Sequence, residues 1–252
     1  MASISDALAR CRRIADAANG EIMVGLSGGK DSLVVLDVLQ RSKAFTRIEA
    51  FAMYLVPGLR CFEAPVNRAA KRAGVKLHYM PHPILSMTLE NSVLKMHTVA
   101  NPARTFNIGK VENALCARTG IRWHAYGDRA SDSLTRRAYT QGCDGVNPDW
   151  LRCWPVWDWS TREVYSYLKA RRIPVTPPQF GAHQSSGVSL EPASLSWMKE
   201  QHPNDYQQLL KYFPFADIQV IRYERGDYDE VPGVFAQAGA SARRKERGLQ
   251  ST

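Results

Sequence analysis

A loop with the residue types that bind phosphate follows the first apolar run of this 252-residue chain. It reads Ser27-Gly28-Gly29-Lys30-Asp31-Ser32. Two adjacent glycines let the backbone approach a ligand closely and adopt dihedral angles that other residues resist. Lys30 adds a full positive charge, and Ser27 and Ser32 add hydroxyl donors. These residue types in this order indicate a socket for a chain of phosphates.

The elements on both sides of the loop would place it at a helix N-terminus. Glu21–Leu26 is apolar enough for a strand, and Leu33–Leu39 has the pattern of the helix that follows. The first amides of a helix have no intrahelical partner and carry about half a positive charge. The common P-loop is excluded, because it would need glycine at Val24 and serine or threonine at Asp31. A glycine-rich turn that binds nothing is the alternative.

The loop resembles the SGGxDS loop of the PP-loop ATP pyrophosphatases. Enzymes of that superfamily grip the β,γ-pyrophosphate of ATP and react at the α-phosphorus. The resemblance implies that all six loop residues bind ATP, that Lys30 and Asp31 assist catalysis, and that Asp31 positions the loop or a Mg²⁺ ion. It also places the adenine and ribose near Met53 and Tyr54, where the second expected strand ends.

A second group of reactive side chains follows the fourth expected strand. The segment Gly127–Arg137 contains Arg129, Arg136 and Arg137 among serines and aspartates. A guanidinium can hold a phosphate or sulfate through two hydrogen bonds. On these residues alone, a solvated helix start with surface arginines is an equal alternative.

The spacing in this segment is similar to the G-x-R-x-x-x-S-x-x-R pattern of the phosphoadenylyl-sulfate (PAPS) reductase branch of the superfamily. The matching residues are Gly127, Arg129, Ser133 and Arg136. Downstream, Pro155–Ser160 resembles that branch's P-x-x-x-W-(S/T) element, and the resemblance covers about residues 21–187. It implies that Gly127 and Ser133 contribute to nucleotide binding. It also implies that Arg129 and Arg136 act in catalysis by holding the second substrate or the α-phosphate.

Departures from that branch bear on activity. Val188 stands where the family has a cysteine, and no cysteine follows Cys153, so the reductase's C-terminal catalytic cysteine is missing. Sulfonucleotide reduction needs a thiolate that attacks sulfur. We therefore expect no reduction by this chain alone and expect Cys61 to be buried and inert. The neighbouring Trp154, Trp157 and Trp159 could stack on a base or fill the core.

The elements that must position these residues alternate between strand and helix. Strands are expected at Glu21–Leu26, Ile48–Val56, Val75–Met80, Arg122–Tyr126 and Cys153–Trp157. Helices are expected at Ser5–Ala18, Phe62–Ala73, Ile108–Thr119 and from a Ser160 capping box to Arg172, with Pro83–Pro102 irregular to helical. This order predicts an α/β fold with a doubly wound, mainly parallel sheet. The resemblance implies that the sheet is of the adenine nucleotide α-hydrolase type.

Two parts of the chain are expected. Residues 1–190 would form the PP-loop nucleotide-binding domain, and residues 191–252 a C-terminal extension with a helix at Pro192–Phe213, a strand at Ile218–Arg222 and a basic tail. The tail contains Arg243, Arg244, Lys245 and Arg247. It is equally compatible with a nucleic-acid contact and with a solvated terminus.

Composition narrows the protein class. The chain carries a net charge of +9, which suggests polyanionic partners, and 44% of its residues are hydrophobic. No apolar run approaches the ~20 residues of a membrane span, and no secretory signal is visible. Five cysteines without a C-x-x-C pair indicate neither a zinc site nor an iron–sulfur site and are typical of a reducing cytoplasm. Whether the chain forms a homodimer is left open.

Together with these features, the resemblance implies an AMP- and pyrophosphate-forming enzyme. It would use ATP and Mg²⁺ to adenylylate a second substrate, in nucleotide or nucleic-acid modification or in sulfur transfer. Two alternatives remain. One is a sulfonucleotide reductase-like enzyme that uses the thiol of a partner protein. The other is a non-catalytic, nucleotide-binding regulator that associates with DNA.

Overall fold

The computed structural model describes residues 4–90, 105–175 and 190–227 of the chain. Two compact units are present, Met1–Val188 and Ser189–Thr252, and each is described by itself. The assignment of the first part as a nucleotide-binding domain and of the second as an extension stays a prediction. Val188 and the tail arginines lie outside the described residues, and so does most of the segment expected at Pro83–Pro102.

The first unit is built on a six-stranded sheet in the order β3-β2-β1-β4-β6-β5. The strands are β1 (Glu21–Gly25), β2 (Arg47–Tyr54), β3 (Lys76–Pro81), β4 (His124–Ala125), β5 (Val146–Asn147) and β6 (Arg152–Cys153). Every pair is parallel except β5 with β6. The predicted doubly wound, mainly parallel α/β sheet is therefore confirmed.

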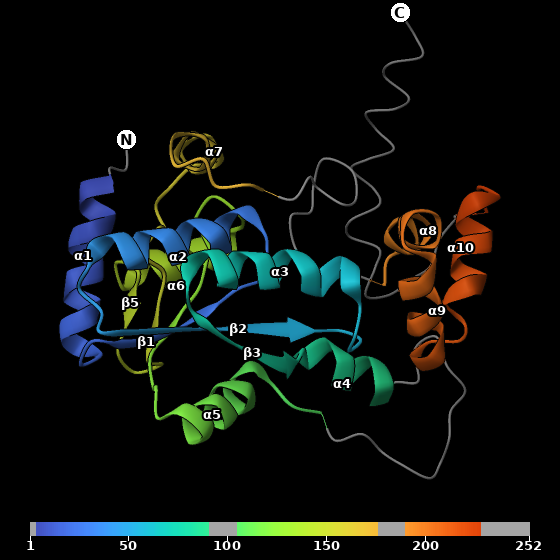
Figure 1. Ribbon diagram of the computed structural model, residues 1–252, viewed down its shortest axis with the longest axis horizontal. Helices are drawn as coiled ribbons and strands as arrows, with labels where there is room; N and C mark the ends of the chain where they lie inside the picture. The colour runs from blue at the N-terminus through green and yellow to red at the C-terminus, as the bar shows by residue number, and fades with distance from the viewer. Residues whose placement is uncertain (1–3, 91–104, 176–189, 228–252) are drawn as a thin grey trace, which may run out of the picture. The chain divides into compact units, whose positions relative to one another are not determined.

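Helices cover both faces of this sheet (Figure 1). One face carries α2 (Lys30–Ser42) and α3 (Arg60–Ala73), and α1 (Ile4–Ala17) and α7 (Thr161–Ala170) pack against α2. The other face carries α5 (Ile108–Thr119) and α4 (Pro83–Glu90), and α6 (Leu134–Gly142) follows β4. In the part of the chain that is described, no helix has the length and apolarity needed to span a bilayer.

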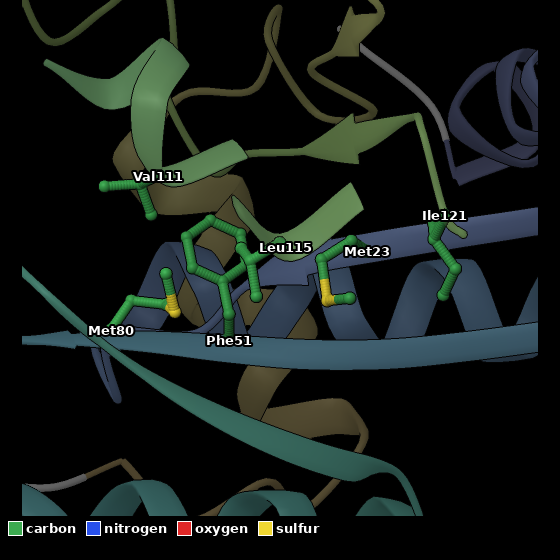
Figure 2. Packing of buried hydrophobic residues seen from close by; sticks show 6 residues of the cluster. All are labelled: Met23, Phe51, Met80, Val111, Leu115 and Ile121. Atoms are coloured by element: carbon green, nitrogen blue, oxygen red, sulfur yellow. The ribbon is translucent and has the colours of Figure 1, made fainter. Parts of the chain in front are cut away.

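The core under α5 is apolar and closely packed. Met23, Phe51 and Met80 come from three neighbouring strands and meet Val111 and Leu115 of α5 (Figure 2). Each of these side chains is at most 6% exposed. Burial of such side chains stabilises the fold by about 1.5–3 kcal/mol each, which fixes the register of the strands that carry the site.

Local signals in the sequence correctly predicted several helix ends. Gly74 and Gly120 follow α3 and α5 in the left-handed conformation, with φ of 65° and 80°. Glycine adopts this conformation without a Cβ penalty. Ser160 begins α7 with the expected capping box, in which its hydroxyl and the Glu163 side chain bond to each other's backbone amides.

Two elements expected in the C-terminal part need correction. The strand expected at Ile218–Arg222 is wrong, because these residues lie in α10 (Ala216–Glu224), which buries Ala216 and Val220 at helical spacing. The helix expected at Pro192–Phe213 is two helices, α8 (Pro192–Gln201) and α9 (Pro203–Tyr212), since proline begins the second one.

The strands that follow α5 are shorter than expected. β4 spans His124–Ala125 instead of Arg122–Tyr126. β6 spans Arg152–Cys153 because the chain turns directly afterwards, where the amide of Trp157 donates to the carbonyl of Trp154. The sequence analysis did not anticipate the antiparallel partner β5.

Candidate functional site

Two loops meet where the strand order reverses. From β1 the chain continues to β2 on one side, whereas β4 is added on the other side of β1. Open α/β sheets bind ligands at this switch point, beyond the carboxyl ends of the strands. The loops that follow β1 and β4 touch there: a Cβ on Gly127 would lie 2.9 Å from the carbonyl carbon of Asp31. Only glycine allows this approach. The contribution of Gly127 to nucleotide binding stays a prediction.

The loop after β1 has the geometry that phosphate binding needs. Gly28 has φ +77°, a conformation that favours glycine, and Gly29 occupies the N-cap position of α2. Ser27 Oγ accepts a hydrogen bond from the Gly29 amide at 3.3 Å, and Ser32 Oγ donates to the Gly29 carbonyl at 2.9 Å. The two hydroxyls thus fix the loop, and the helix start supplies partial positive charge beside it.

Charged side chains form a chain of contacts beneath this loop. Lys30 Nζ lies 2.8 Å from Asp31 Oδ2. Asp31 Oδ1 lies 2.9 Å from Arg129 Nε, as an ion pair without a well-aligned hydrogen bond. Asp31 therefore connects the lysine of the first loop to the arginine of the second. The structure brings Lys30, Asp31 and Arg129 together, and their roles in catalysis stay predictions.

Arg129 occupies a different environment from the one expected of a ligand contact. Its side chain is 1% exposed, and Nη2 donates to Asp132 Oδ1 at 2.8 Å. Nη1 donates to the Trp159 carbonyl and to Thr161 Oγ1, each at 3.3 Å. With its donors directed at the protein, Arg129 holds the two loops and α7 together. A direct contact of Arg129 with substrate stays a prediction.

Arg136 is the more accessible of the two arginines. It lies in the first turn of α6, where the Ser133 side chain caps the helix by accepting a hydrogen bond from the Arg136 amide. The side chain is 44% exposed and contacts Asp128 at 3.2 Å and Asp132 at 3.0 Å. Partial burial acts to lower the pKa of Arg136, but the two aspartates outweigh it and raise that pKa. Arg136 therefore stays charged and can reach a ligand.

Met53 and Tyr54 lie where the sequence predicted, at the end of β2. The neighbouring strand β1 leads into the loop, so both residues share its edge of the sheet. Met53 packs against the apolar core, and Tyr54 is half-buried. Their contact with adenine and ribose stays a prediction.

The cysteines and tryptophans near the site are mostly interior residues. Trp154 and Trp159 are 2% and 3% exposed, which agrees with a role in the core. Cys61 is buried as expected. Burial raises the pKa of the Cys11 thiol to about 12 and also raises that of Cys153. These two thiols stay protonated and unreactive at neutral pH.

A protein-held Mg²⁺ ion does not fit the residues as they are placed. Both oxygens of Asp31 face cations, Lys30 and Arg129. Across the described residues, no group of three or more His, Cys, Asp or Glu side chains could hold a metal ion. The assignment of Asp31 to Mg²⁺ stays a prediction, and no step below depends on it.

A buried polar cluster beside β4 was not expected from the sequence. Glu112 of α5 accepts from Arg152 Nε and Nη2, each at 2.7 Å, and from the Tyr126 hydroxyl at 2.6 Å. Burial is the main cause that raises the pKa of Tyr126, and the charge of Glu112 and its hydrogen bond with the hydroxyl raise it further. The partners come from α5, from β6 and from the loop after β4, so their spacing in the sequence gave no signal.

Comparison with known families finds a match over most of this unit. The pattern of the Phosphoadenosine phosphosulfate reductase domain matches residues 21–186, which is more than half of the chain. The matched span begins at β1 and includes both loops at the switch point.

Curated proteins are similar to part of this sequence. The tRNA-cytidine(32) 2-sulfurtransferase of Xylella fastidiosa (strain 9a5c) is 34% identical over 103 residues, which are 40% of this chain and 30% of that protein. The protein of the same name from Alkalilimnicola ehrlichii is 33% identical over 99 residues, 38% of this chain and 27% of its own length. The match thus spans less than a third of these relatives.

Solved structures show a more general likeness. The U34-tRNA thiolase NcsA from Methanococcus maripaludis, solved with its 4Fe-4S cluster, has a TM-score of 0.44 and 15% identity, covering 85% of this chain and 80% of that one. An NH3-dependent NAD synthetase from Campylobacter jejuni has a TM-score of 0.42 and 12% identity, covering 93% of this chain and 100% of that one.

Proposed function

The chain belongs to the Phosphoadenosine phosphosulfate reductase domain family, and from this premise we propose that it is a PP-loop enzyme that adenylylates a second substrate with ATP. An oxygen of that substrate attacks the α-phosphorus of ATP. The bond from the α-phosphorus to the bridging oxygen breaks, and pyrophosphate leaves into the loop. AMP is released when a later nucleophile displaces the activated oxygen.

The geometry of the loop after β1 carries this proposal. Gly28 in the left-handed conformation and Gly29 at the start of α2 leave the backbone open to a phosphate chain. The nearby Lys30 ammonium adds the charge that a leaving pyrophosphate requires. Chemistry of this kind depends mainly on positioning and charge stabilisation, which such a loop supplies.

The roles of the remaining residues follow from their accessibility. Ser27 and Ser32 hold the loop, Lys30 binds the β,γ-phosphates, and Met53 and Tyr54 lie where the base and sugar would rest. Arg136, half-exposed at the rim, is the residue placed to meet the α-phosphate or the second substrate. Arg129 positions Asp31 and the second loop.

A base of an RNA is the second substrate that we propose. The relatives are named for transferring sulfur to cytidine 32 of a tRNA. The same chemistry here would activate a base oxygen as an adenylate; a separate sulfide donor would then attack the base carbon, and the activated oxygen would leave with AMP. The burial of Cys11, Cys61 and Cys153 counts against sulfonucleotide reduction by these three thiols.

Incubation with ATP labelled at the α-phosphate tests the reaction class. We expect labelled AMP and free pyrophosphate, with formation increased by unmodified tRNA transcripts and a sulfide donor. Lys30→Ala should lose this activity, whereas Lys169→Ala, on the exposed side of α7, should keep it. Formation of ADP and phosphate, or no nucleotide turnover with any RNA, would contradict the proposal.

A further inference from the structure

Three aromatic rings cluster beside the site, on the edge of the sheet formed by β5 and β6. The Tyr139 ring lies 5.2 Å from Trp154 and 6.4 Å from Trp150, between centroids. Trp150 and Trp154 meet edge to face at 6.5 Å. Trp154 is 2% exposed, whereas Trp150 is 51% exposed. The cluster therefore has a buried anchor and an outer ring that presents a large aromatic surface to solvent.

Arginines border both ends of this cluster. The guanidinium carbon of Arg152 lies 5.7 Å from the centroid of the Trp150 ring, and Glu112 fixes Arg152 in place through two hydrogen bonds. At the other end, Asp128 accepts from Trp154 Nε1 at 3.2 Å and pairs with Arg136. The cluster is thus held by neighbours on two elements, so Trp150 is a preorganised surface residue.

The cluster is continuous with the proposed active site. Asp128 directly follows Gly127, whose Cα packs against the backbone of Asp31 and Ser32 at the start of α2. One residue of the loop after β4 therefore contacts the phosphate loop, and the next contacts Trp154. A substrate entering beside Arg136 would pass along these rings.

The chemistry of the surface favours a nucleobase. Every base has a π-face that stacks on an aromatic side chain, and an arginine beside the ring strengthens such contacts. The segment 128–152 has four arginines and four aspartates, so attraction to phosphates is balanced locally. A flat, rigid ring without excess charge suits a base better than a sugar-phosphate backbone.

We propose that Trp150, supported by Tyr139, Trp154 and Arg152, is a platform on which an unpaired base of the RNA substrate stacks. This inference rests on the proposed function and adds a specificity: the RNA must be single-stranded where it meets the enzyme. The platform would hold a base that neighbours the target base while the target reaches the nucleotide.

The test measures RNA binding by the full chain. A short fluorescein-labelled single-stranded RNA, and the same strand annealed to its complement, would be titrated and followed by anisotropy. We expect Trp150→Ala to weaken single-strand binding by about 5- to 100-fold, the range for one lost stacking contact, and to leave duplex binding unchanged. Trp150→Phe keeps a π-face and should bind within a few-fold of the wild type.

Two further variants keep the test decisive. Trp150→Leu fills space without a π-face, so it should show the same loss even if Trp150→Ala is unstable. Tyr165→Ala removes another half-exposed aromatic side chain, 49% exposed on α7, and should bind single strands normally. The loss at Trp150 should be the same at low and high salt, because stacking and not charge is removed.

Equal binding by the wild type, Trp150→Ala and Trp150→Leu would overturn the inference, as would an equal loss for duplex RNA. Loss of self-association by Trp150→Leu in sedimentation, with RNA binding intact, would also overturn it and indicate an interface between copies. If Trp150→Ala and Trp150→Leu keep their RNA affinity and still form AMP, the platform is refuted and the proposed function is retained. Stacking without any AMP formation would instead refute the enzyme assignment and retain the platform.

Discussion

The two loops at the switch point differ in how their charges are arranged. The loop after β1 is small and depends on its backbone, with Gly28 and Gly29 beside one lysine. The segment after β4 contains arginines, but aspartates of the same segment pair with them: Asp132 with Arg129 and Arg136, and Asp128 with Arg136.

The difference shows that a count of positive side chains is a poor guide to where an anion binds. In the second segment most of the charge organises the protein, because Arg129 is buried among internal partners. In the first, Lys30 is paired with Asp31, but the glycines and the helix start add backbone amides and partial positive charge that an anion can use. Binding capacity is thus expected to lie mainly in the first loop and structural strength in the second.

The largest expected effect concerns Arg129. Arg129→Leu would leave Asp31 and Asp132 without their buried partner, and we expect a loss of about 3–5 kcal/mol in the free energy of unfolding. Urea denaturation measures it. Arg129→Lys keeps the charge but cannot reproduce the forked contacts, so its free energy of unfolding should lie between those of the wild type and Arg129→Leu. If Arg129 instead served only substrate, Arg129→Leu would unfold like the wild type and lose activity alone.

The next prediction tests the lysine of the first loop. Lys30→Ala should weaken ATP binding by about 10- to 100-fold, the range for one charge-assisted contact. The fold should persist, because Asp31 keeps Arg129 as a partner. Titration calorimetry measures the affinity, with Lys169→Ala as the control for loss of a surface charge. Unchanged ATP affinity in Lys30→Ala would contradict the expectation that the first loop binds the nucleotide.

The contact between the loops gives a third prediction. A Cβ on Gly127 would lie 2.9 Å and 3.0 Å from backbone atoms of Asp31 and Ser32, and backbone cannot move aside as a side-chain end can. Gly127→Ala should therefore cost about 1–3 kcal/mol of stability and weaken ATP binding as α2 shifts. Gly142→Ala is the matched control: it has open space at its Cβ, so its stability should be unchanged or higher.

The first loop was predictable from the sequence because its determinants are local. Strand, glycines and helix follow one another directly, and so do the caps at Gly74, Gly120 and Ser160. The alternation of strands and helices likewise predicted the parallel sheet. In each case the residues that decide the structure are neighbours in the chain.

The environment of the second segment was not predictable, because distant residues set it. Arg129 is buried by contacts with Asp31, Trp159 and Thr161, which no spacing rule connects. Trp150 was missed because the short strands β5 and β6 around it have too few residues to show a pattern. The error at Ile218–Arg222 had the same origin, a run too short to separate strand from helix.

The pH dependence of stability should reveal a difference between β1 and β4, the strands that lead into the two loops. β1 buries apolar side chains, whereas β4 buries His124, which is 2% exposed, with Nε2 unpaired among the described residues. Burial lowers the pKa of His124; Glu112 opposes this shift and Arg152 adds to it. Below about pH 6.5 the unfolded chain therefore binds a proton that the folded chain does not. Stability should be full above that pH and fall as the pH decreases toward the lowered folded pKa.

Comparing His124→Gln with the wild type isolates this proton. The wild type should lose more stability than the variant between pH 7.5 and 5.5, by no more than about 1.4 kcal/mol per pH unit, the limit for one proton. Urea midpoints at both pH values measure it. His82→Gln is the comparison variant, since burial also lowers the pKa of His82 but this residue lies outside β4. Equal pH slopes for His124→Gln and the wild type would contradict the assignment.

The smallest effect is expected for Arg136, and it decides whether the second segment has any charge available for a ligand. Its ion pairs are half-exposed, so Arg136→Ala should change the free energy of unfolding by less than about 1 kcal/mol. Adenine nucleotides should raise the melting temperature of the wild type, because they bind the folded state, and Arg136→Ala should reduce that rise. The matched control is Arg137→Ala. Arg137 is an exposed neighbour on α6 whose Nε donates to the Ala130 carbonyl at 3.4 Å, and its loss should leave the rise unchanged. An undiminished rise in Arg136→Ala would mean that the aspartates neutralise both arginines, and that the loop after β1 binds the nucleotide without help from β4.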